Sequence, residues 1–179
     1  REVHRNLLDG VNFEFATATR IVFGPGKLAE AGKIANALGK RALIVIGKSA
    51  RAIQHAEPLL RQLDEYATFS ITGEPTFDVV RTGALQACDE RCDFVISFGG
   101  GSVIDTGKAI AMLLTNGGDP LQYAGTDKVP KPGADTILIP TTAGTGSEVS
   151  RFAILSDTKA HLKKGIVSDM LYAKVSLID

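Results

Sequence analysis

Cysteine and histidine are scarce in this sequence, and tryptophan is absent. Only two cysteines and three histidines occur among its 179 residues. Cys88 and Cys92 lie four positions apart without a second pair, so they indicate neither a zinc site nor a disulfide framework, and we expect ordinary reduced thiols. His4, His55 and His161 are far apart in sequence, so no metal ligand is predicted among them.

An excess of charge of one sign is also missing, as are long apolar runs. Lysine plus arginine equals aspartate plus glutamate at 20 each, which gives no net field to attract nucleic acid or an anionic membrane. No apolar run approaches the ~20 residues of a membrane span, and residues 1–10 lack the apolar core of a signal peptide. We therefore expect a cytoplasmic protein without a nucleic-acid or membrane partner, whose recognition of small molecules is local.

Glycine, in contrast, is abundant, and three glycines stand together at Gly99–Gly101. They follow the apolar run Phe94–Phe98 and precede a segment with helical spacing from Ser102 to Leu114. Three residues without Cβ atoms leave room for a phosphate, and the start of a helix adds about +0.5 of partial charge. The pattern predicts a phosphate-binding turn. The alternative is a tight strand-to-helix turn without a ligand.

The spacing around these glycines excludes two common phosphate-binding fingerprints. The dinucleotide pattern G-x-G-x-x-G would need glycine at Ile104. The pattern G-x-x-x-x-G-K-[ST] would need glycine at Ser102 and a hydroxyl at Ala109.

Strands and helices alternate along most of the chain. This order predicts an α/β fold with a doubly wound, mainly parallel sheet and a short β-rich flank at the C-terminal end. Residues 1–12 show no periodicity and are expected to be an N-terminal extension, while residues 13–179 form one dinucleotide-binding domain. The expected strands are 13–16, 20–23, 42–46, 66–71, 94–98 and 136–140, the expected helices are 27–38, 50–63, 77–91 and 102–114, and the flank contains the β-like pieces 152–155, 165–167 and 174–178.

A second motif, Pro140–Val149, is a loop of hydroxyls and glycines. Together with Gly99–Lys108 and the opening Phe23–Gly26, it closely resembles the iron-containing (group III) alcohol dehydrogenases, over residues 12–179. The resemblance implies a Rossmann-like, dehydroquinate-synthase-like N-terminal domain. It also implies a helical C-terminal domain, expected to be absent from this chain, in which an aspartate and three histidines hold the metal.

The resemblance assigns roles to individual residues of this chain. The pyrophosphate would lie on the glycine turn, and Asp105 would support the cofactor near the nicotinamide. Lys163 would approach the ribose, and the less favoured alternative is a solvated charge in the cluster 159–164. The implied cofactor-binding residues are Gly99, Gly100, Gly101, Ser102, Asp105, Thr141, Thr142, Ser150 and Lys163, with the two threonines and Ser150 near the adenosine and its phosphate.

The chain departs from the family pattern at Gly47. Many members that prefer NAD have an aspartate there, which bonds the ribose hydroxyls and repels a 2′-phosphate. Gly47, Lys48 and Ser49 would instead offer amides, a cation and a hydroxyl. We therefore predict that NADP(H) is accepted alongside NAD(H), or preferred to it. The alternative is that Gly47 only begins a turn while NAD binds through the other residues.

The activity that the resemblance implies is hydride transfer between an alcohol and an aldehyde or ketone. In the full-length protein, Fe²⁺ or Zn²⁺ would act as the Lewis acid. This chain alone is expected to hold no catalytic or metal-binding residue and to be inactive, and the protein is expected to be a homo-oligomer. The alternatives are a maleylacetate reductase, a glycerol dehydrogenase or a dehydroquinate synthase relative, and, in another class, a non-catalytic nucleotide-binding module.

Overall fold

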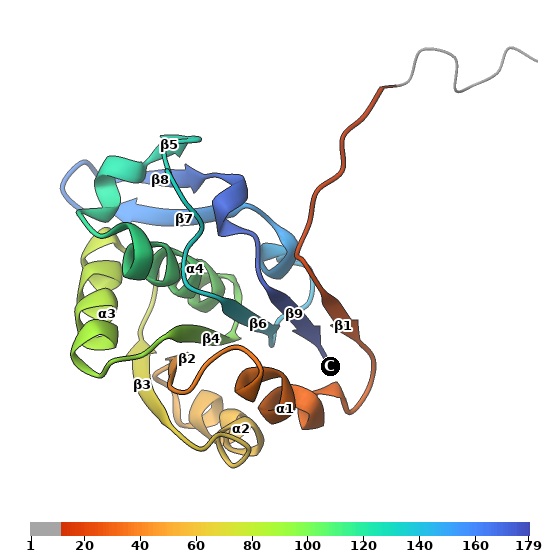
Figure 1. Cartoon of the computed structure of the whole chain (residues 1–179). Coiled ribbons are helices and arrows are strands. Elements are labelled where there is room, and N and C mark those ends of the chain that lie inside the picture. Colours follow the sequence, from red (N-terminus) through yellow and green to blue (C-terminus); the bar gives the residue numbers. More distant parts are fainter. Residues whose placement is uncertain (1–11) are drawn as a thin grey trace, which may run out of the picture.

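The computed structural model describes residues 12–179 (Figure 1). The predicted N-terminal extension, apart from its last residue, lies outside this part of the chain. Within residues 12–179, a six-stranded sheet has the order β1-β9-β6-β4-β2-β3, and every neighbouring pair is parallel. Its strands are β1 (Ile21–Phe23), β2 (Ala42–Gly47), β3 (Tyr66–Ile71), β4 (Phe94–Gly99), β6 (Thr136–Pro140) and β9 (Val175–Ile178).

A smaller mixed sheet lies beside the main one. Its strands are β5 (Gly125–Thr126), β7 (Phe152–Asp157) and β8 (Leu162–Val167). β8 pairs with β5 in parallel and with β7 in antiparallel orientation. The expected β-rich flank is thus present, and it packs against α4 (Gly101–Asn116), on the side away from the main sheet (Figure 1).

Helices cover both faces of the main sheet (Figure 1). α1 (Ala31–Asn36) and α2 (Ala50–Leu60) pack on one face, and α3 (Phe77–Asp89) and α4 on the other. The alternation of side chains along β2 explains both layers, because Leu43 and Val45 join the core with α3 and α4 while Ile44 and Ile46 join the core with α1 and α2. A run that is apolar at every position therefore forms a strand buried on both faces. This confirms the predicted fold class.

α4 is the most buried helix of this part of the chain. Every residue from Val103 to Leu113 is buried, because β4 lies on one side of the helix and β7 on another. The helix approaches the sheet closely at Gly107. A Cβ atom there would clash with Ser97 Oγ and would lie 3.1 Å from Ser97 Cβ.

Four 3₁₀ turns complete the described elements: Lys27–Glu30, Pro120–Tyr123, Ser147–Val149 and Asp169–Leu171. No helix within residues 12–179 combines the length and the apolar composition that crossing a membrane requires.

Three expectations about individual elements were wrong. The segment 174–178 was expected in the flanking sheet, but β9 lies inside the main sheet between β1 and β6. Val175 and Leu177 are buried in the core with α1 and α2, which fixes the strand there. Residues 13–16 form no strand, since Phe13 and Phe15 are exposed and pair with no neighbour among the described residues.

The expected helix 27–38 is divided into a 3₁₀ turn, Lys27–Glu30, and the short helix α1. The carboxylate of Asp179 explains the irregular start. Its two oxygens accept hydrogen bonds from the amides of Gly26 (2.7 Å) and Leu28 (2.8 Å), which satisfies amides that no helical carbonyl can reach.

Candidate nucleotide-binding site

The carboxyl ends of the six parallel strands lie along one edge of the main sheet. From β2 the chain continues to β3 on one side, and then returns to β4 on the other side of β2. In open α/β sheets, ligands bind in the crevice at such a switch point. The structure brings Gly47, at the end of β2, and Gly99, at the end of β4, to this crevice, and Gly99 is paired with Pro140 at the end of β6.

The glycine turn is shaped by space and not by unusual backbone angles. Gly100 precedes α4 with φ −77° and ψ −176°, which any residue adopts. A Cβ at Gly99 would lie 2.6 Å from Val103 Cγ2, and one at Gly100 would lie 3.1 Å from Thr142 Oγ1. Gly99 therefore serves helix packing, whereas Gly100 keeps the approach beside Thr142 open.

The start of α4 has no side-chain cap. The first amides of a helix lack acceptors within the helix, so an uncapped start is available to an external anion. By contrast, Ser49 caps α2 by accepting a hydrogen bond from the Ala52 amide (3.1 Å), and Thr76 caps α3 by accepting one from the Val79 amide (3.1 Å). At the predicted phosphate-binding turn, the first amides of α4 are therefore not occupied by a side-chain cap.

The hydroxyl-rich loop lies directly against this turn. The Thr141 amide donates to the Gly99 carbonyl (3.0 Å), which continues the pairing of β6 with β4. A Cβ at Gly101 would lie 3.3 Å from Ser147 Oγ, so the later part of the loop covers the first turn of α4. Thr141, Thr142 and Ser147 therefore surround the glycines from one side.

Two of the predicted residues use their side chains within the protein. Asp105 is 8% exposed, and its Oδ2 accepts a hydrogen bond from the Ile154 amide in β7 (3.0 Å). The hydroxyl of Ser150 donates to the Ser147 carbonyl (3.3 Å). Their proposed contacts with the cofactor stay predictions.

Lys108 is a residue of this site that sequence reasoning quoted within a motif but assigned no role. It is 1% exposed, and its Nζ donates to the carbonyls of Ser147 (2.8 Å), Ser150 (3.3 Å) and Phe152. Nζ also lies 3.3 Å from Asp105 Oδ1, without the alignment of a hydrogen bond. Burial lowers the pKa of Lys108, and the neighbouring Asp105 opposes this shift. The apolar helical spacing on both sides of Lys108 could have indicated that it is buried.

Lys163 lies on β8 and is exposed. Its Nζ donates to Glu74 Oε1 (2.8 Å), and the hydroxyl of Ser156 donates to Glu74 Oε2 (2.9 Å). The hydrogen bond from Lys163 is the main cause of a lowered pKa at Glu74. Because Glu74 follows the carboxyl end of β3, Lys163 is connected to the predicted edge of the sheet. This arrangement is compatible with a ribose contact and with a solvated charge alike.

Gly47, the last residue of β2, and Lys48 and Ser49 after it lie at the carboxyl edge of the sheet, and their contact with a 2′-phosphate stays a prediction. The Lys48 amide donates to the Ile71 carbonyl (2.9 Å), so the chain leaves β2 beside β3. The Ser49 hydroxyl accepts the capping bond and still has a proton to donate to a ligand. A Cβ atom at Gly47 would lie 3.4 Å from Ala52 Cβ, which is an ordinary van der Waals contact.

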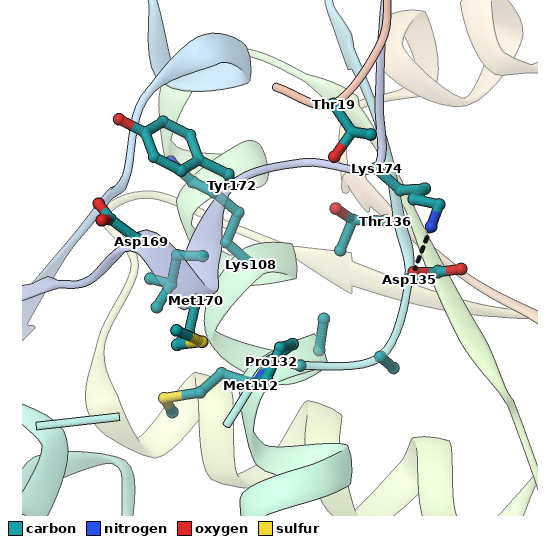
Figure 2. Close-up of a pocket in the computed structure, with 14 residues that line it drawn as sticks. Thr19, Lys108, Met112, Pro132, Asp135, Thr136, Asp169, Met170, Tyr172 and Lys174 are labelled. Carbon is teal, nitrogen blue, oxygen red and sulfur yellow. Dashed lines mark ion pairs between the residues drawn. The ribbon is translucent and has the colours of Figure 1, made fainter. Parts of the chain in front are cut away.

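A cleft of about 510 Å³ adjoins this edge and is lined by residues that include His55, Phe98, Thr141 and Asp179. A second cavity, of about 310 Å³, lies at the opposite edge, where β6 and β9 begin. Figure 2 shows this second cavity with the ion pair of Lys174 and Asp135, whose charged atoms are 4.0 Å apart. Among the predicted cofactor-binding residues, Thr141 lines the first cleft, so this cleft adjoins the candidate site, which is the glycine turn with the loop beside it.

The family that the sequence resembles binds iron, and the described residues do not fit such a metal. Among residues 12–179, no three histidine, cysteine, aspartate or glutamate side chains lie close enough together to hold an ion. No step of the chemistry is therefore assigned to a metal in this part of the protein.

Comparison with known proteins agrees with this architecture. The family model described as "Iron-containing alcohol dehydrogenase" matches residues 18–179. Sulfoacetaldehyde reductase of Bilophila wadsworthia is 38% identical over 175 residues, which cover 93% of this chain and 45% of the relative. The chain thus spans about half the length of the curated relatives it matches.

Solved structures show the same fold. A 1,3-propanediol oxidoreductase matches with a TM-score of 0.87 and 33% identity, over 94% of this chain and 46% of the other. A sulfoacetaldehyde reductase from Bifidobacterium kashiwanohense, solved in complex with NAD⁺, matches with a TM-score of 0.85 and 31% identity, over 95% of this chain and 46% of the other. With its sheet order, its glycine turn and these matches, the chain belongs to the iron-containing alcohol dehydrogenase family.

Proposed function

We propose that the protein is an NAD(P)-dependent oxidoreductase that transfers hydride between an alcohol and an aldehyde or ketone, and that residues 13–179 are its nucleotide-binding domain. The observation that carries this proposal is the uncapped start of α4 behind Gly99–Gly101, at the switch point of the sheet. Relatives named as a sulfoacetaldehyde reductase and a 1,3-propanediol dehydrogenase support the reaction class.

In this proposal the backbone supplies most of the contacts to the phosphates. The pyrophosphate lies over Gly100 and Gly101, where the free amides of α4 donate to its oxygens. Ser102, Thr141 and Thr142 flank it with hydroxyl groups. Asp105, Ser150 and Lys163 complete the predicted set of contacts toward the nicotinamide, the adenosine phosphate and the ribose.

The substrate pocket and the metal chemistry are proposed for the whole protein, to which this chain contributes the cofactor-binding site. We expect this chain alone to bind nucleotide without turnover. A small alcohol or aldehyde is the proposed substrate, and the proposed location is the cytoplasm, in line with the free thiols of both cysteines. Among the alternatives, the relatives named for alcohols and aldehydes favour an alcohol dehydrogenase over a glycerol dehydrogenase or a synthase.

NADP(H) is proposed as an accepted cofactor alongside NAD(H). The absence of a carboxylate at Gly47, together with the free proton donor of Ser49 and the exposed cation of Lys48, supports this choice. The related sulfoacetaldehyde reductase of Bifidobacterium kashiwanohense binds NAD⁺ in its structure, so binding of both nucleotides is the outcome that we expect here.

The test is a calorimetric titration of the 179-residue chain with NADH and, separately, with NADPH. We expect saturable binding of both at one site per chain, and no oxidation of added alcohol. Binding of NADH alone would reject the assignment at Gly47 and keep the nucleotide-binding function. If neither nucleotide binds to chain whose folding has been verified by circular dichroism, the proposed site at the start of α4 is wrong.

A further inference from the structure

The loop between β6 and β7 is attached to the end of β4 at its beginning and to α4 at its end. At its beginning, the Thr141 amide donates to the Gly99 carbonyl. At its end, Lys108 and Asp105 hold residues 147–154, through the carbonyls that Lys108 Nζ contacts and through the Ile154 amide. Between these attachments Gly144 and Gly146 have φ of 94° and 65°, which bend the loop over the first turn of the helix.

Lys108 is the central group of the second attachment. Its side chain has 0% exposure, so its positive charge is separated from water and must be satisfied by the protein. The three backbone carbonyls and the Ser150 hydroxyl at 3.4 Å surround Nζ, and all four belong to residues 147–152. Removing the cation would therefore free several parts of this segment at once.

Two weaker contacts hold the same segment from other elements. The Thr17 hydroxyl donates to the Val149 carbonyl (3.2 Å), and the Ser176 hydroxyl donates to the Glu148 carbonyl. Both come from neutral hydroxyl groups, which form weaker hydrogen bonds than a buried ammonium group. Lys108 is consequently the strongest connection between this segment and the helix whose start binds the phosphates.

We propose that Lys108 is a positioning residue, which fixes the loop 141–150 to α4 so that its hydroxyls stand beside the glycine turn before the nucleotide arrives. The proposal rests on the proposed nucleotide-binding function. Lys108 Nζ bonds to carbonyls of residues 147–152 and its side chain has 0% exposure, so we assign it a contact with the loop and not with the phosphates. Its effect on affinity comes from ordering the loop in advance.

The test compares Lys108→Met, Lys108→Arg and the exposed control Lys131→Met in two measurements. Hydrogen–deuterium exchange of the free protein reports the order of peptides that cover residues 141–151, with β4 as the internal reference. Calorimetric titration reports affinity for NADH. In Lys108→Met we expect faster exchange of the loop with unchanged protection of β4, and an affinity that is weaker by about tenfold. Lys108→Arg retains a cation, so it should keep more of the loop protection and more of the NADH affinity than Lys108→Met. Lys131→Met should match the wild type in both measurements.

Several outcomes would overturn the proposal. One is a Lys108→Met protein whose loop exchanges as slowly as in the wild type, and another is faster exchange of the loop and β4 in equal measure, which indicates a merely structural role. If the Lys108 variants do not fold, the exchange of the wild type still tests the proposal. Residues 147–152 should then be protected together with α4, and exchange as fast as in an open chain would contradict the proposal. A wild type that binds no NADH contradicts the proposed function, whereas the exchange measurement continues to test Lys108.

Discussion

Gly100 allows the phosphate role of the glycine turn to be separated from its role in folding. Its backbone angles suit any residue, and the Thr142 hydroxyl is the group that a new Cβ would approach. For Gly100→Val we therefore expect loss of NADH binding, measured by calorimetry, while the melting temperature falls by only about 2–4 °C or less.

Gly99→Val is the matched comparison for this substitution. Its Cβ would lie 2.6 Å from Val103 Cγ2, so α4 would have to move away from β4. Gly99→Val should therefore lower the melting temperature more than Gly100→Val does. Equal losses of stability in the two variants would support the interpretation of the glycines as a structural turn alone.

Gly47 is the residue at which the choice between cofactors can be tested. The Cβ atom of a residue at position 47 would lie 3.4 Å from Ala52 Cβ, an ordinary contact. The carboxylate of an aspartate there would repel a 2′-phosphate and bond the ribose hydroxyls of NAD. We expect Gly47→Asp to shift the ratio of the two dissociation constants toward NADH by about tenfold, or about 1.4 kcal/mol. An unchanged ratio, determined by parallel titrations, would place the 2′-phosphate elsewhere.

At the scale of single residues, the sequence located the backbone part of the site better than its side chains. Three glycines between a buried strand and a helix allow few arrangements, so the position of the turn could be predicted. The carboxylate of Asp105 accepts from an amide 49 positions away, and the hydroxyl of Ser150 accepts from Lys108 Nζ, 42 positions away. Such contacts depend on tertiary packing, which no local pattern contains.

Arg81 and Asp119 connect the helix α3 with the 3₁₀ turn Pro120–Tyr123. Arg81 donates from Nε to Asp119 Oδ2 (2.7 Å) and from Nη2 to Oδ1 (3.1 Å), and these bonds are the main cause of a lowered pKa at Asp119. A carboxyl group whose pKa is lowered in the folded state stabilises the protein above its unfolded pKa. That contribution is lost as the pH falls through the folded pKa.

We therefore expect the wild type to be more stable than Asp119→Asn at pH 7. The difference should begin to shrink near the unfolded pKa of about 4, and it should vanish only below the lowered folded pKa, where the carboxylate is protonated in both states. Because both side chains are partly exposed, the difference should stay below about 1 kcal/mol. Urea unfolding of both proteins at several pH values measures it. Asparagine can still accept from the Leu121 amide, so a difference that persists at low pH would show that the ion pair is not its source.

At the scale of elements, long buried strands and helices with an apolar face were predictable, and short pieces were not. β3 and β6 have the expected bounds, because a continuous or alternating apolar pattern bounded by polar residues has one stable solution. β9 has four residues, too few for a local pattern to assign it to one sheet, so its place between β1 and β6 depends on packing in the core with α1. β5 has two residues and was not expected.

For the whole molecule, we propose association with a second copy through the segment that precedes and forms β1. Phe15 is 80% exposed and Phe23 is 75% exposed, while β1 pairs only with β9 among the described strands and leaves its outer edge open. Exposed aromatic side chains beside an unpaired strand edge favour self-association.

Sedimentation velocity over a range of concentrations should show more than a monomer for the wild type. The double variant Phe15→Ser and Phe23→Ser should shift the distribution toward the monomer. Leu85→Ser on α3, at a side chain of similar exposure (67%), is the control and should leave the distribution unchanged. A wild type that sediments as a monomer at every concentration would contradict the proposal.

The close contact of Gly107 with Ser97 has a consequence for how this domain can vary. Helix α4 rests on the sheet there with no space for even one methyl group, and six residues separate this point from Gly101, or about 9 Å of rigid helix. The methyl group of an alanine at position 107 would push α4 away from β4 at Ser97. The start of α4 at Gly101 would then tilt relative to the sheet. The anion site would lose its alignment, although no residue that contacts the nucleotide had been changed.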